Sequence, residues 1–273
     1  MKKLLCILLC AFTFLMSACS SDNGSQEMTI TVFEADKADA ILIQTEEGNV
    51  LIDAGLEENR DQLLSSLAQR GVDELEALII THFDKDHVGG ADAVLETLKV
   101  NHVYTTWQSK SSDDITSYEE ALVKAGLSTT VIKGTQKFTL GGAVFTVYGA
   151  SDSYEEDESN NSSLIVHVSF GNKTYLFMGD AQDERIEEFL TYSVTDADFL
   201  KVPYHGHTQD TLEELISAVT PEVSVITNGE DEPSQKEIKK TVKILEEAGS
   251  EVYQTVSGTV TVQCTQEGFS VSQ

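Results

Sequence analysis

The strongest constraint on the fold of this chain is a six-residue loop with a histidine at each end, His82-Phe83-Asp84-Lys85-Asp86-His87. An apolar run over residues 75–81 precedes it and predicts a buried strand, and a helix-like stretch over residues 91–98 follows. Two imidazoles and two carboxylates this close would repel one another or lose hydration unless a cation gathered them. The loop could instead be only a polar cap of the next helix, because Asp is a good N-cap residue. The spacing favours a metal site, since all four side chains can converge from one tight turn.

From residue 28 onward, short apolar runs alternate with helical segments. The expected strands are residues 29–33, 40–45, 49–53, 75–81, 102–106, 136–140, 143–147, 163–170, 173–178, 199–202, 223–227, 252–254, 259–264 and 269–271. The expected helices are residues 60–70, 91–98, 116–125, 181–191, 211–218 and 234–248. Strands come in two batches, each followed by helices, which indicates two sheets packed face to face with helices outside. We expect one domain over residues 28–273, although this pattern alone would also fit a doubly wound sheet.

The first residues are typical of a processing segment. Lys2 and Lys3 are followed by an apolar stretch over residues 4–16, which is shorter than the ~20 residues of a membrane-spanning helix. The segment Leu15-Met16-Ser17-Ala18-Cys19 resembles a bacterial lipobox, in which the cysteine is acylated and becomes the first residue after cleavage. Met16 stands where Leu is usual. An ordinary signal peptide that happens to contain a cysteine is the alternative.

This resemblance implies a lipoprotein signal peptide at residues 1–18, lipidation of Cys19 and a polar tether over residues 19–27. The mature protein would be extracytoplasmic and held at a bacterial membrane by its lipid alone. The other two N-terminal cysteines leave with the signal peptide. Only Cys264 then remains, so no disulfide can form within the mature chain.

Three further expected strands end in an aspartate or a histidine. Asp180 follows an apolar run at residues 176–178, His205 follows residues 200–203, and Asp53 follows Leu51-Ile52. In layered α/β folds, sites form where strand ends line up. Asp180 can also be explained as the N-cap of the helix expected after it, and both roles are compatible.

Together these motifs resemble those of the metallo-β-lactamase superfamily, which are an early Asp, His-x-His-x-Asp-His, a His, Gly-Asp and a final His. The chain is more similar still to the soluble domain of ComEC-type competence (DNA-uptake) proteins. That branch has His-x-Asp-x-Asp-His, Asn-Asn-x-Ser-Leu before Gly-Asp, and Lys-Val-Pro-His-His-Gly-Ser. The matching segments are residues 82–87, Asn160-Asn161-Ser162-Ser163-Leu164, Gly179-Asp180 and Lys201-Val202-Pro203-Tyr204-His205-Gly206-His207. The resemblance covers residues 28–273.

The resemblance implies an α/β fold, the αββα sandwich, with two divalent metal ions at one edge. The ligands would be His82, Asp84 and Asp180 on one ion, and Asp86, His87, Asp180 and His205 on the other. Asp53 would orient the loop from behind these ligands. Two such ions can bridge a hydroxide and polarise the bond under attack, and Asp86 or Asp84 would take the proton. The oxygen-rich first site favours manganese over zinc, while imidazole still permits zinc.

The chain departs from the family pattern in several places. The turn Asp-Val-Gly-Gln-Gly-Asp-Ala appears as Glu34-Ala35-Asp36-Lys37-Ala38-Asp39-Ala40, without either glycine. The third-motif His is absent, and Asn160 or Asn161 can partly replace it. Tyr204 replaces the first His of the His-His-Gly pair, which leaves the second as the ligand. His207 stands where Ser is usual and is either a substrate contact or an exposed loop residue.

The ligand set predicts a metal-dependent hydrolase whose nucleophile is a metal-bridging hydroxide, and three classes stay open. The favoured class is a phosphodiesterase acting on nucleic acid or on a smaller phosphate ester. The second is a lactam or lactone hydrolase, and the third is a lipid-anchored, non-catalytic binding module linked to DNA uptake. The formal charge is −28, and it becomes more negative once the two N-terminal lysines are removed. Since nucleic-acid binding normally needs a basic surface, a small phosphate ester is favoured over a duplex. Lys85 and Lys201 are the positive charges expected near the site.

Overall fold

A computed structural model describes residues 26–273, except residues 152, 156–157, 193, 195 and 231–234. The expected signal peptide at residues 1–18, the lipidation site Cys19 and the tether up to residue 25 lie outside the described residues. Within the described part of the chain, no helix is both long enough and apolar enough to cross a membrane.

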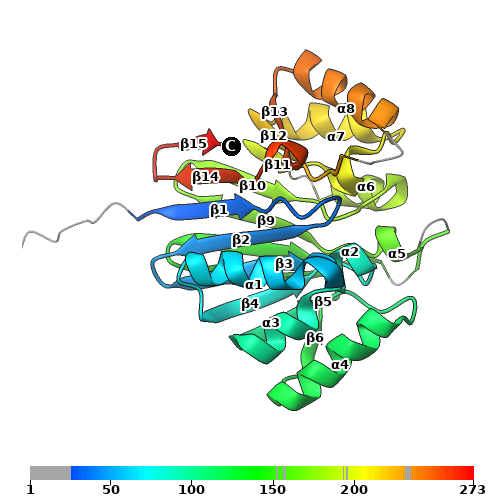
Figure 1. The fold of residues 1–273 in the computed structure, drawn as a ribbon. Coiled ribbons are helices and arrows are strands. Elements are labelled where there is room, and N and C mark those ends of the chain that lie inside the picture. Colours follow the sequence, from blue (N-terminus) through cyan, green and yellow to red (C-terminus); the bar gives the residue numbers. More distant parts are fainter. Residues whose placement is uncertain (1–25, 152, 156–157, 193, 195, 231–234) are drawn as a thin grey trace, which may run out of the picture.

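Two mixed β-sheets pack face to face (Figure 1). The first has the order β15-β14-β1-β2-β3-β4-β5-β6 and the second has the order β13-β12-β11-β10-β9-β8-β7. The strands of the first sheet are β1 (Met28–Val32), β2 (Ala40–Thr45), β3 (Gly48–Ala54), β4 (Glu74–Ile80), β5 (Lys99–Thr105), β6 (Thr129–Val131), β14 (Val260–Cys264) and β15 (Phe269–Ser272). Those of the second are β7 (Thr135–Leu140), β8 (Ala143–Tyr148), β9 (Ile165–Phe170), β10 (Lys173–Phe177), β11 (Phe199–Lys201), β12 (Val223–Ile226) and β13 (Glu251–Gln254).

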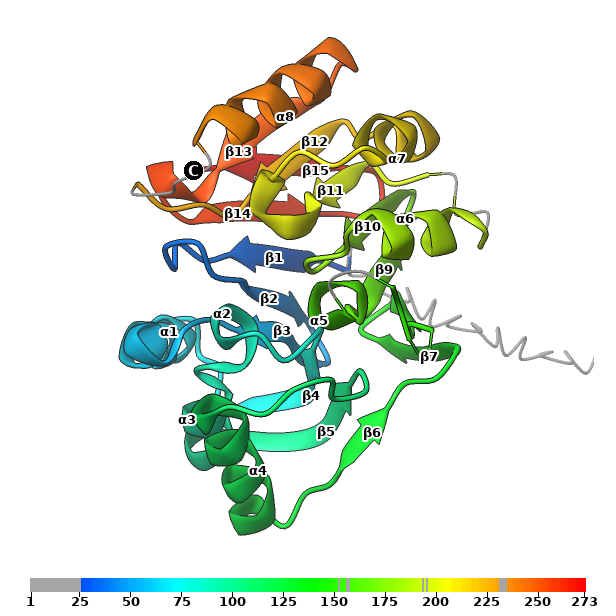
Figure 2. The same ribbon diagram turned by 90° about the vertical axis from the view of Figure 1, so that its right-hand side faces the viewer.

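Helices cover the outer face of each sheet (Figures 1 and 2). The first sheet carries α1 (Arg60–Gln69), α3 (Ala91–Thr97) and α4 (Asp113–Ala125), and the second carries α6 (Asp183–Leu190), α7 (Leu212–Val219) and α8 (Gln235–Glu247). The shorter helices are η1 (Glu57–Asn59), α2 (Lys85–Val88), α5 (Glu158–Asn161), η2 (Pro203–Gly206) and η3 (Thr255–Ser257). The predicted α/β architecture, two sheets between outer helices, is confirmed.

Three apolar layers hold the sandwich together. Ile52 of β3 and Phe177 of β10 lie in the core between the sheets. Their chain neighbours point outward, Leu51 into the layer under α1 and α3, and Leu176 into the layer under α6 and α7. Because both faces of these central strands are buried, the strands read as continuous apolar runs and not as an alternating pattern.

Parallel pairing brings the ends of the central strands to one edge of the sandwich. β3 is parallel to β4, and β10, β11 and β12 are parallel to one another. β2 is antiparallel to β3, with Ala40 opposite Ala54, so the residues just before β2 lie at this same edge. The edge carries α2 and α5 and faces the viewer in Figure 2. The residues that follow β3, β4, β10, β11 and β12 therefore meet there with the residues that precede β2.

The sequence pattern does not predict β6 or the short helices α2, α5, η1, η2 and η3. β6 has three residues and mostly exposed side chains, and α5 is a single turn, so neither carries a readable periodicity. α4 begins at Asp113, earlier than expected, because the Ser112 hydroxyl caps it by accepting a hydrogen bond from the Ile115 N–H at 3.2 Å.

Candidate metal centre

Five of the predicted ligands come together at this edge. His82 and His87 follow β4, Asp180 follows β10, His205 lies in η2 after β11, and Asp86 lies in α2. The first four are buried, and Asp86 is partly exposed at the mouth of the cluster. The side chains that follow these strand ends thus lie together at one edge of the sandwich.

The carboxylate of Asp180 lies between the three histidines. Its Oδ1 is 3.3 Å from Nε2 of His87, and its Oδ2 is 3.1 Å from Nε2 of His205 and 4.0 Å from Nε2 of His82. Asp86 Oδ2 lies 3.6 Å from Nε2 of His205. Among the described residues, three overlapping groups have ligand atoms within 4.8 Å of one another: His82 with His87 and Asp180, Asp86 with His87 and His205, and Asp39 with Asp53 and His87.

All three histidines are held in the same tautomer. Nδ1 of His87 donates to Asp53 Oδ2 at 2.8 Å, because a carboxylate can only accept. Nδ1 of His205 donates to the Thr227 carbonyl at 3.1 Å for the same reason. Nδ1 of His82 lies 3.2 Å from Thr81 Oγ1, whose own proton goes to Asp53 Oδ2. Each Nε2 is therefore left facing the space between the rings.

Four buried atoms at this space have no hydrogen-bond partner among the described residues: Nε2 of His82, His87 and His205, and Oδ1 of Asp180. Burying a polar atom without a partner is costly, and most buried polar atoms in proteins are paired. Four such atoms converging on one space fit metal coordination, and imidazole nitrogen with carboxylate oxygen suits zinc and manganese. The residues present therefore fit a divalent metal centre.

Asp53 supports the loop from behind, as predicted. Its Oδ1 accepts the Thr81 N–H and its Oδ2 accepts the Thr81 hydroxyl, both at 2.7 Å, in addition to His87. Asp53 is fully buried and has φ of +57°, a left-handed conformation that Asp tolerates better than most residues. The strand end is thus bent so that one carboxylate holds both the loop backbone and a histidine.

The turn that carries His205 is strained. Tyr204 and His205 have φ of +47° and +50°, and Gly206 follows with φ of +80°. Consecutive left-handed residues other than glycine are costly and cluster at functional sites. Here the strained turn directs the His205 ring inward, toward Asp180.

Asp84 lies beside the cluster with its Oδ1 engaged elsewhere. That oxygen contacts both Lys110 Nζ and Ser159 Oγ, and lies 3.8 Å from Nε2 of His82. Lys110 comes from the segment between β5 and α4, which showed no motif in the sequence. A cation and a hydroxyl thus occupy the position that the family resemblance assigns to metal coordination by Asp84.

The remaining candidates make contacts outside the cluster. Oδ1 of Asn161 accepts the N–H groups of Gln182 and Arg185 at 3.1 and 3.2 Å, so the oxygen that would bind a metal caps α6. Asn160 is buried at the end of α5, where its carbonyl accepts the Ser163 N–H at 3.0 Å. His207 stacks on Tyr204 with ring centroids 4.6 Å apart, and its Nδ1 lies 3.2 Å from Glu237 of α8.

The sequence pattern does not predict the buried ion pair between Lys201 and Asp39. Lys201 Nζ lies 2.5 Å from Asp39 Oδ2 and 4.0 Å from Asp180 Oδ1, and both Lys201 and Asp39 are buried. The signal was present, because Lys201 stands inside the apolar run Phe199-Leu200-Lys201-Val202, where a lysine must find a partner.

The surroundings of the cluster shift the pKa values of His82 and His87 in opposite directions. Burial, with a further contribution from the charge of His87, lowers the pKa of His82 to about 3. Burial also acts to lower the pKa of His87, but Asp180 and Asp53 outweigh it and raise that pKa well above its usual value. Burial acts to lower the pKa of His205 too, but Asp180 outweighs it and raises that pKa. Before any ion binds, protons therefore reside on His87 and His205 in preference to His82, which is neutral.

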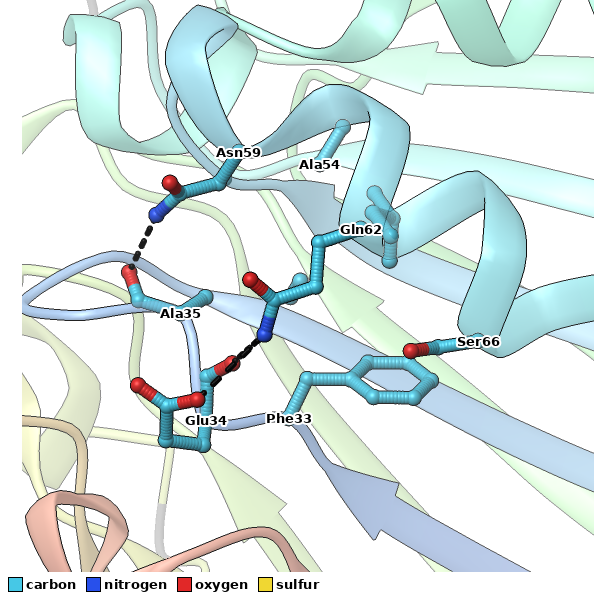
Figure 3. A pocket seen from close by; sticks show the side chains of 10 residues that line it. Phe33, Glu34, Ala35, Ala54, Asn59, Gln62 and Ser66 are labelled. Carbon is cyan, nitrogen blue, oxygen red and sulfur yellow. Dashed lines mark hydrogen bonds between the residues drawn. The ribbon is translucent and has the colours of Figure 1, made fainter.

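The segment that departs from the family pattern is held by hydrogen bonds from η1 and α1 (Figure 3). Asn59 Nδ2 donates to the Ala35 carbonyl at 3.2 Å, and Gln62 Nε2 donates to the carboxylate and carbonyl of Glu34 at 3.3 Å each. The hollow between them has a volume of only about 10 Å³, which is room for one water. Asp36 stands where the family has its first glycine and adopts φ of +59°. The turn is thus retained without glycine, and it delivers Asp39 to the site.

A sequence model described as the metallo-beta-lactamase superfamily matches residues 34–229. Among curated proteins, ComE operon protein 3 of Bacillus subtilis is 26% identical over 194 residues, which is 71% of this chain and 25% of that protein. Recombination protein 2 of Haemophilus influenzae is 26% identical over 213 residues, which is 78% of this chain and 25% of that protein. Competence protein ComA of Neisseria gonorrhoeae is 26% identical over 207 residues, 74% of this chain and 27% of that protein. The chain thus spans about a quarter of the length of these relatives.

Solved structures share the fold at low sequence identity. The metallo-beta-lactamase fold protein YhfI of Bacillus subtilis has a TM-score of 0.60 and 15% identity, covering 88% of this chain and 99% of its own. CmlA, a diiron beta-hydroxylase from Streptomyces venezuelae, has a TM-score of 0.56 and 13% identity, covering 88% of this chain and 54% of its own. These likenesses agree with the sequence match over residues 34–229, and the chain belongs to the metallo-β-lactamase superfamily.

Proposed function

We propose that this protein is a metal-dependent hydrolase with a dinuclear centre, acting on a phosphodiester or a smaller phosphate ester. The observation that carries the proposal is the convergence of Nε2 of His82, His87 and His205 with Oδ1 of Asp180, all buried and all lacking a hydrogen-bond partner among the described residues. Nε2 of His87 and of His205 lie 3.3 and 3.1 Å from the Asp180 carboxylate, so a proton on either ring would pair with it, whereas metal ions would engage all four atoms at once.

Two divalent ions held by these side chains would supply a water of lowered pKa and a Lewis acid for the oxygen under attack. The protein's own contribution is to orient the side-chain atoms that would bind the metal ions. Asp53 and Thr227 set the tautomers of His87 and His205, and burial keeps His82 neutral. Asp86, partly exposed at the mouth, can accept a proton from the reaction.

Charge narrows the proposed substrate class. Lys110 places an ammonium group at the mouth, beside Asp84, where it can bind an anionic substituent of a substrate. The chain as a whole carries −28, which opposes a long polyanion much more than a small phosphate ester. A lactam or lactone hydrolase remains the alternative with the same metal chemistry, and the match to a competence protein leaves nucleic acid in the test panel.

A non-catalytic binding module is the second candidate function. It is favoured by Asp84, whose Oδ1 contacts Lys110 and Ser159 in place of a metal ion. In either case we propose that the mature protein is an extracytoplasmic lipoprotein, anchored through Cys19.

The test begins with metal content after loading with zinc or manganese, for which we expect about two ions per chain. Loaded protein is then assayed on bis(p-nitrophenyl) phosphate, p-nitrophenyl phosphate, single-stranded DNA, a chromogenic lactam and a lactone. Hydrolysis of a phosphate ester that is lost in His205→Ala supports the proposal. Absence of bound metal would overturn it, and bound metal without hydrolysis of any substrate would favour the binding module.

A further inference from the structure

Asp39 is buried behind the predicted ligands and contacts several of the groups that hold them. Its Oδ2 pairs with Lys201 Nζ at 2.5 Å, and its Oδ1 accepts the Thr227 hydroxyl at 2.6 Å. Its backbone N–H donates to the Asp86 carbonyl at 3.0 Å. Its own carbonyl accepts the Gly55 N–H at 2.9 Å, which joins it to the end of β3. Asp39 is 1% exposed, so these partners replace its hydration completely.

Three of these four contacts lead to a predicted metal ligand. The backbone bond holds Asp86 directly. Thr227 supplies its carbonyl and its hydroxyl, 3.1 and 3.0 Å from Nδ1 of His205, while its hydroxyl proton goes to Asp39. Lys201 lies 4.0 Å from Oδ1 of Asp180, so its charge faces the carboxylate between the histidines.

Stability alone is a weak explanation for this buried pair. Two charges removed from water carry a desolvation cost that their attraction often fails to exceed, and apolar replacements of similar volume are often as stable. Lys201 lies in β11 beside Phe199 and Leu200, in surroundings that an apolar side chain would fill. Burial acts to raise the pKa of Asp39, but the charge of Lys201, with smaller contributions from His87 and His205, keeps it below its usual value.

We propose that Asp39 is a positioning residue of the metal centre, which fixes Asp86, Asp180 and His205 through one peptide group and one carboxylate. The inference rests on the proposed dinuclear centre and deepens it. An Asp39 oxygen also lies within 4.8 Å of ligand atoms of Asp53 and His87. Both Asp39 oxygens are already paired, one with Lys201 and one with Thr227, so we assign Asp39 to positioning and not to coordination. Residues that orient metal ligands in this way typically change metal affinity by roughly 10–100-fold when replaced.

The second sheet offers a matched control pair. Asp198 Oδ1 lies 2.7 Å from Lys173 Nζ, and Asp198 Oδ2 accepts the Thr174 N–H at 2.8 Å. Lys173 begins β10, whereas the metal centre lies beyond the end of β10. Asp198 directly precedes β11, which ends at Lys201, so Asp198→Asn breaks a less buried Asp–Lys pair at the opposite end of that strand.

The experiment measures dissociation constants for zinc and manganese by chelator competition, and the absorption spectrum of the cobalt-substituted protein. The variants are Asp39→Asn, the double variant Asp39→Asn/Lys201→Met, Thr227→Val and Asp198→Asn. The double variant removes both charges, so no buried charge is left unpaired. We expect both Asp39 variants to bind metal roughly 10–100-fold more weakly and to shift the cobalt spectrum. Asp198→Asn should only lower the melting temperature.

The outcomes separate this inference from the proposed function. If the wild type binds no metal, the dinuclear centre itself is wrong. If the wild type binds metal and a folded Asp39 variant binds it with unchanged affinity and spectrum, Asp39 is only structural and the inference is overturned. If neither Asp39 variant folds, Thr227→Val decides, because it removes the hydroxyl that links Asp39 to His205. Its unchanged metal affinity would then overturn the inference, and weaker binding would support it.

Discussion

Nδ1 of His87 lies 2.8 Å from Oδ2 of Asp53, and this contact determines which nitrogen of the imidazole is left for a metal ion. The same carboxylate accepts the N–H and the hydroxyl of Thr81, so one residue at the end of β3 fixes both the loop backbone and the ring. The relationship explains why a buried aspartate with a left-handed backbone conformation is placed behind the metal centre and not within it.

Asp53→Asn is the sharpest test of that contact. Asn tolerates the left-handed backbone at this position about as well as Asp, so the substitution adds little strain. The amide offers one acceptor oxygen where three donors now converge, and it can present an N–H toward Nδ1. We expect metal affinity to fall by roughly 10–100-fold, measured by chelator competition. Metal affinity equal to that of wild type would show that the contact does not set the tautomer.

Asp180→Ala should remove metal from the whole centre, because its carboxylate lies between all three histidines. The matched control is Asn161→Ala. The structure shows that Asn161, and not Asp180, supplies the side-chain oxygen at the start of α6. We expect Asn161→Ala to cost about 0.5–2 kcal/mol of stability and to keep its metal.

Elemental analysis and thermal melting distinguish the two variants. If Asp180→Ala keeps both its metal and its activity, the assignment of the site is wrong. If Asn161→Ala loses metal while its melting temperature is unchanged, Asn161 is a ligand after all, as the family resemblance allowed.

Metal binding should strengthen as pH rises through the neutral range. Without metal, the pKa of His87 is raised by Asp180 and Asp53, despite the opposing effect of burial, so His87 carries a proton that an ion at Nε2 must displace. Because this pKa is raised, protonation of His87 stabilises the metal-free fold fully below pH 6.5, and that contribution is lost as pH rises through the folded-state pKa. Both effects favour the metal-bound form at higher pH.

Calorimetry in two buffers of different ionisation enthalpy measures the protons released on metal binding. We expect a release of about one proton from His87 at neutral pH and a further contribution from His205, because both pKa values are raised. His82 should release none, because its pKa of about 3 leaves it neutral already. A metal affinity that is constant between about pH 6 and 8 would contradict this prediction.

The local part of the site could be predicted from the sequence, and the long-range part could not. The loop from His82 to His87 places its ligands within one turn, so their proximity follows from chain geometry alone. Asp180 and His205 were placed by their positions after apolar strands, which requires only that the strand ends share an edge. The fold followed from the same runs together with the family resemblance.

The pair of Asp39 and Lys201 depends on the packing of one sheet against the other. Asp39 precedes β2 in the first sheet and Lys201 ends β11 in the second, 162 positions apart by their numbers, and periodicity within either strand does not reveal that register. Asn161 could not be assigned for a different reason. The sequence around an asparagine near a site is the same whether its amide oxygen binds a metal ion or caps a helix. Lys110 lies in a segment without any repeating pattern, so its approach to Asp84 depends on tertiary structure alone.

Cys19→Ser tests the proposed anchor. If Cys19 is acylated, the wild type should partition with membranes, and the variant should accumulate as an unprocessed precursor, because the processing enzyme requires the modified cysteine. Fractionation followed by mass measurement of the mature N-terminus checks both points. Normal processing and release of the variant would indicate an ordinary signal peptide.

Lys110→Met should separate the two roles open to the lysine at the mouth of the site. Its ammonium contacts Asp84 Oδ1, which the family resemblance assigns to a metal ion, so its removal should strengthen metal binding several-fold. Stability should change by only about 0–1 kcal/mol, because the ion pair is partly exposed. If the same ammonium binds an anionic substrate once an ion has taken Asp84, the KM for a phosphodiester should rise while that for a neutral ester is unchanged.

Lys124→Met is the control for Lys110→Met, since Lys124 forms an exposed ion pair with Glu96 at 2.8 Å, away from the site. It should leave metal affinity and both KM values as they are. Weaker metal binding by Lys110→Met would show that the lysine supports Asp84 and does not compete for it. Unchanged KM values on both ester classes would remove the charge argument for a phosphate ester, and would leave the lactam and lactone classes equally open.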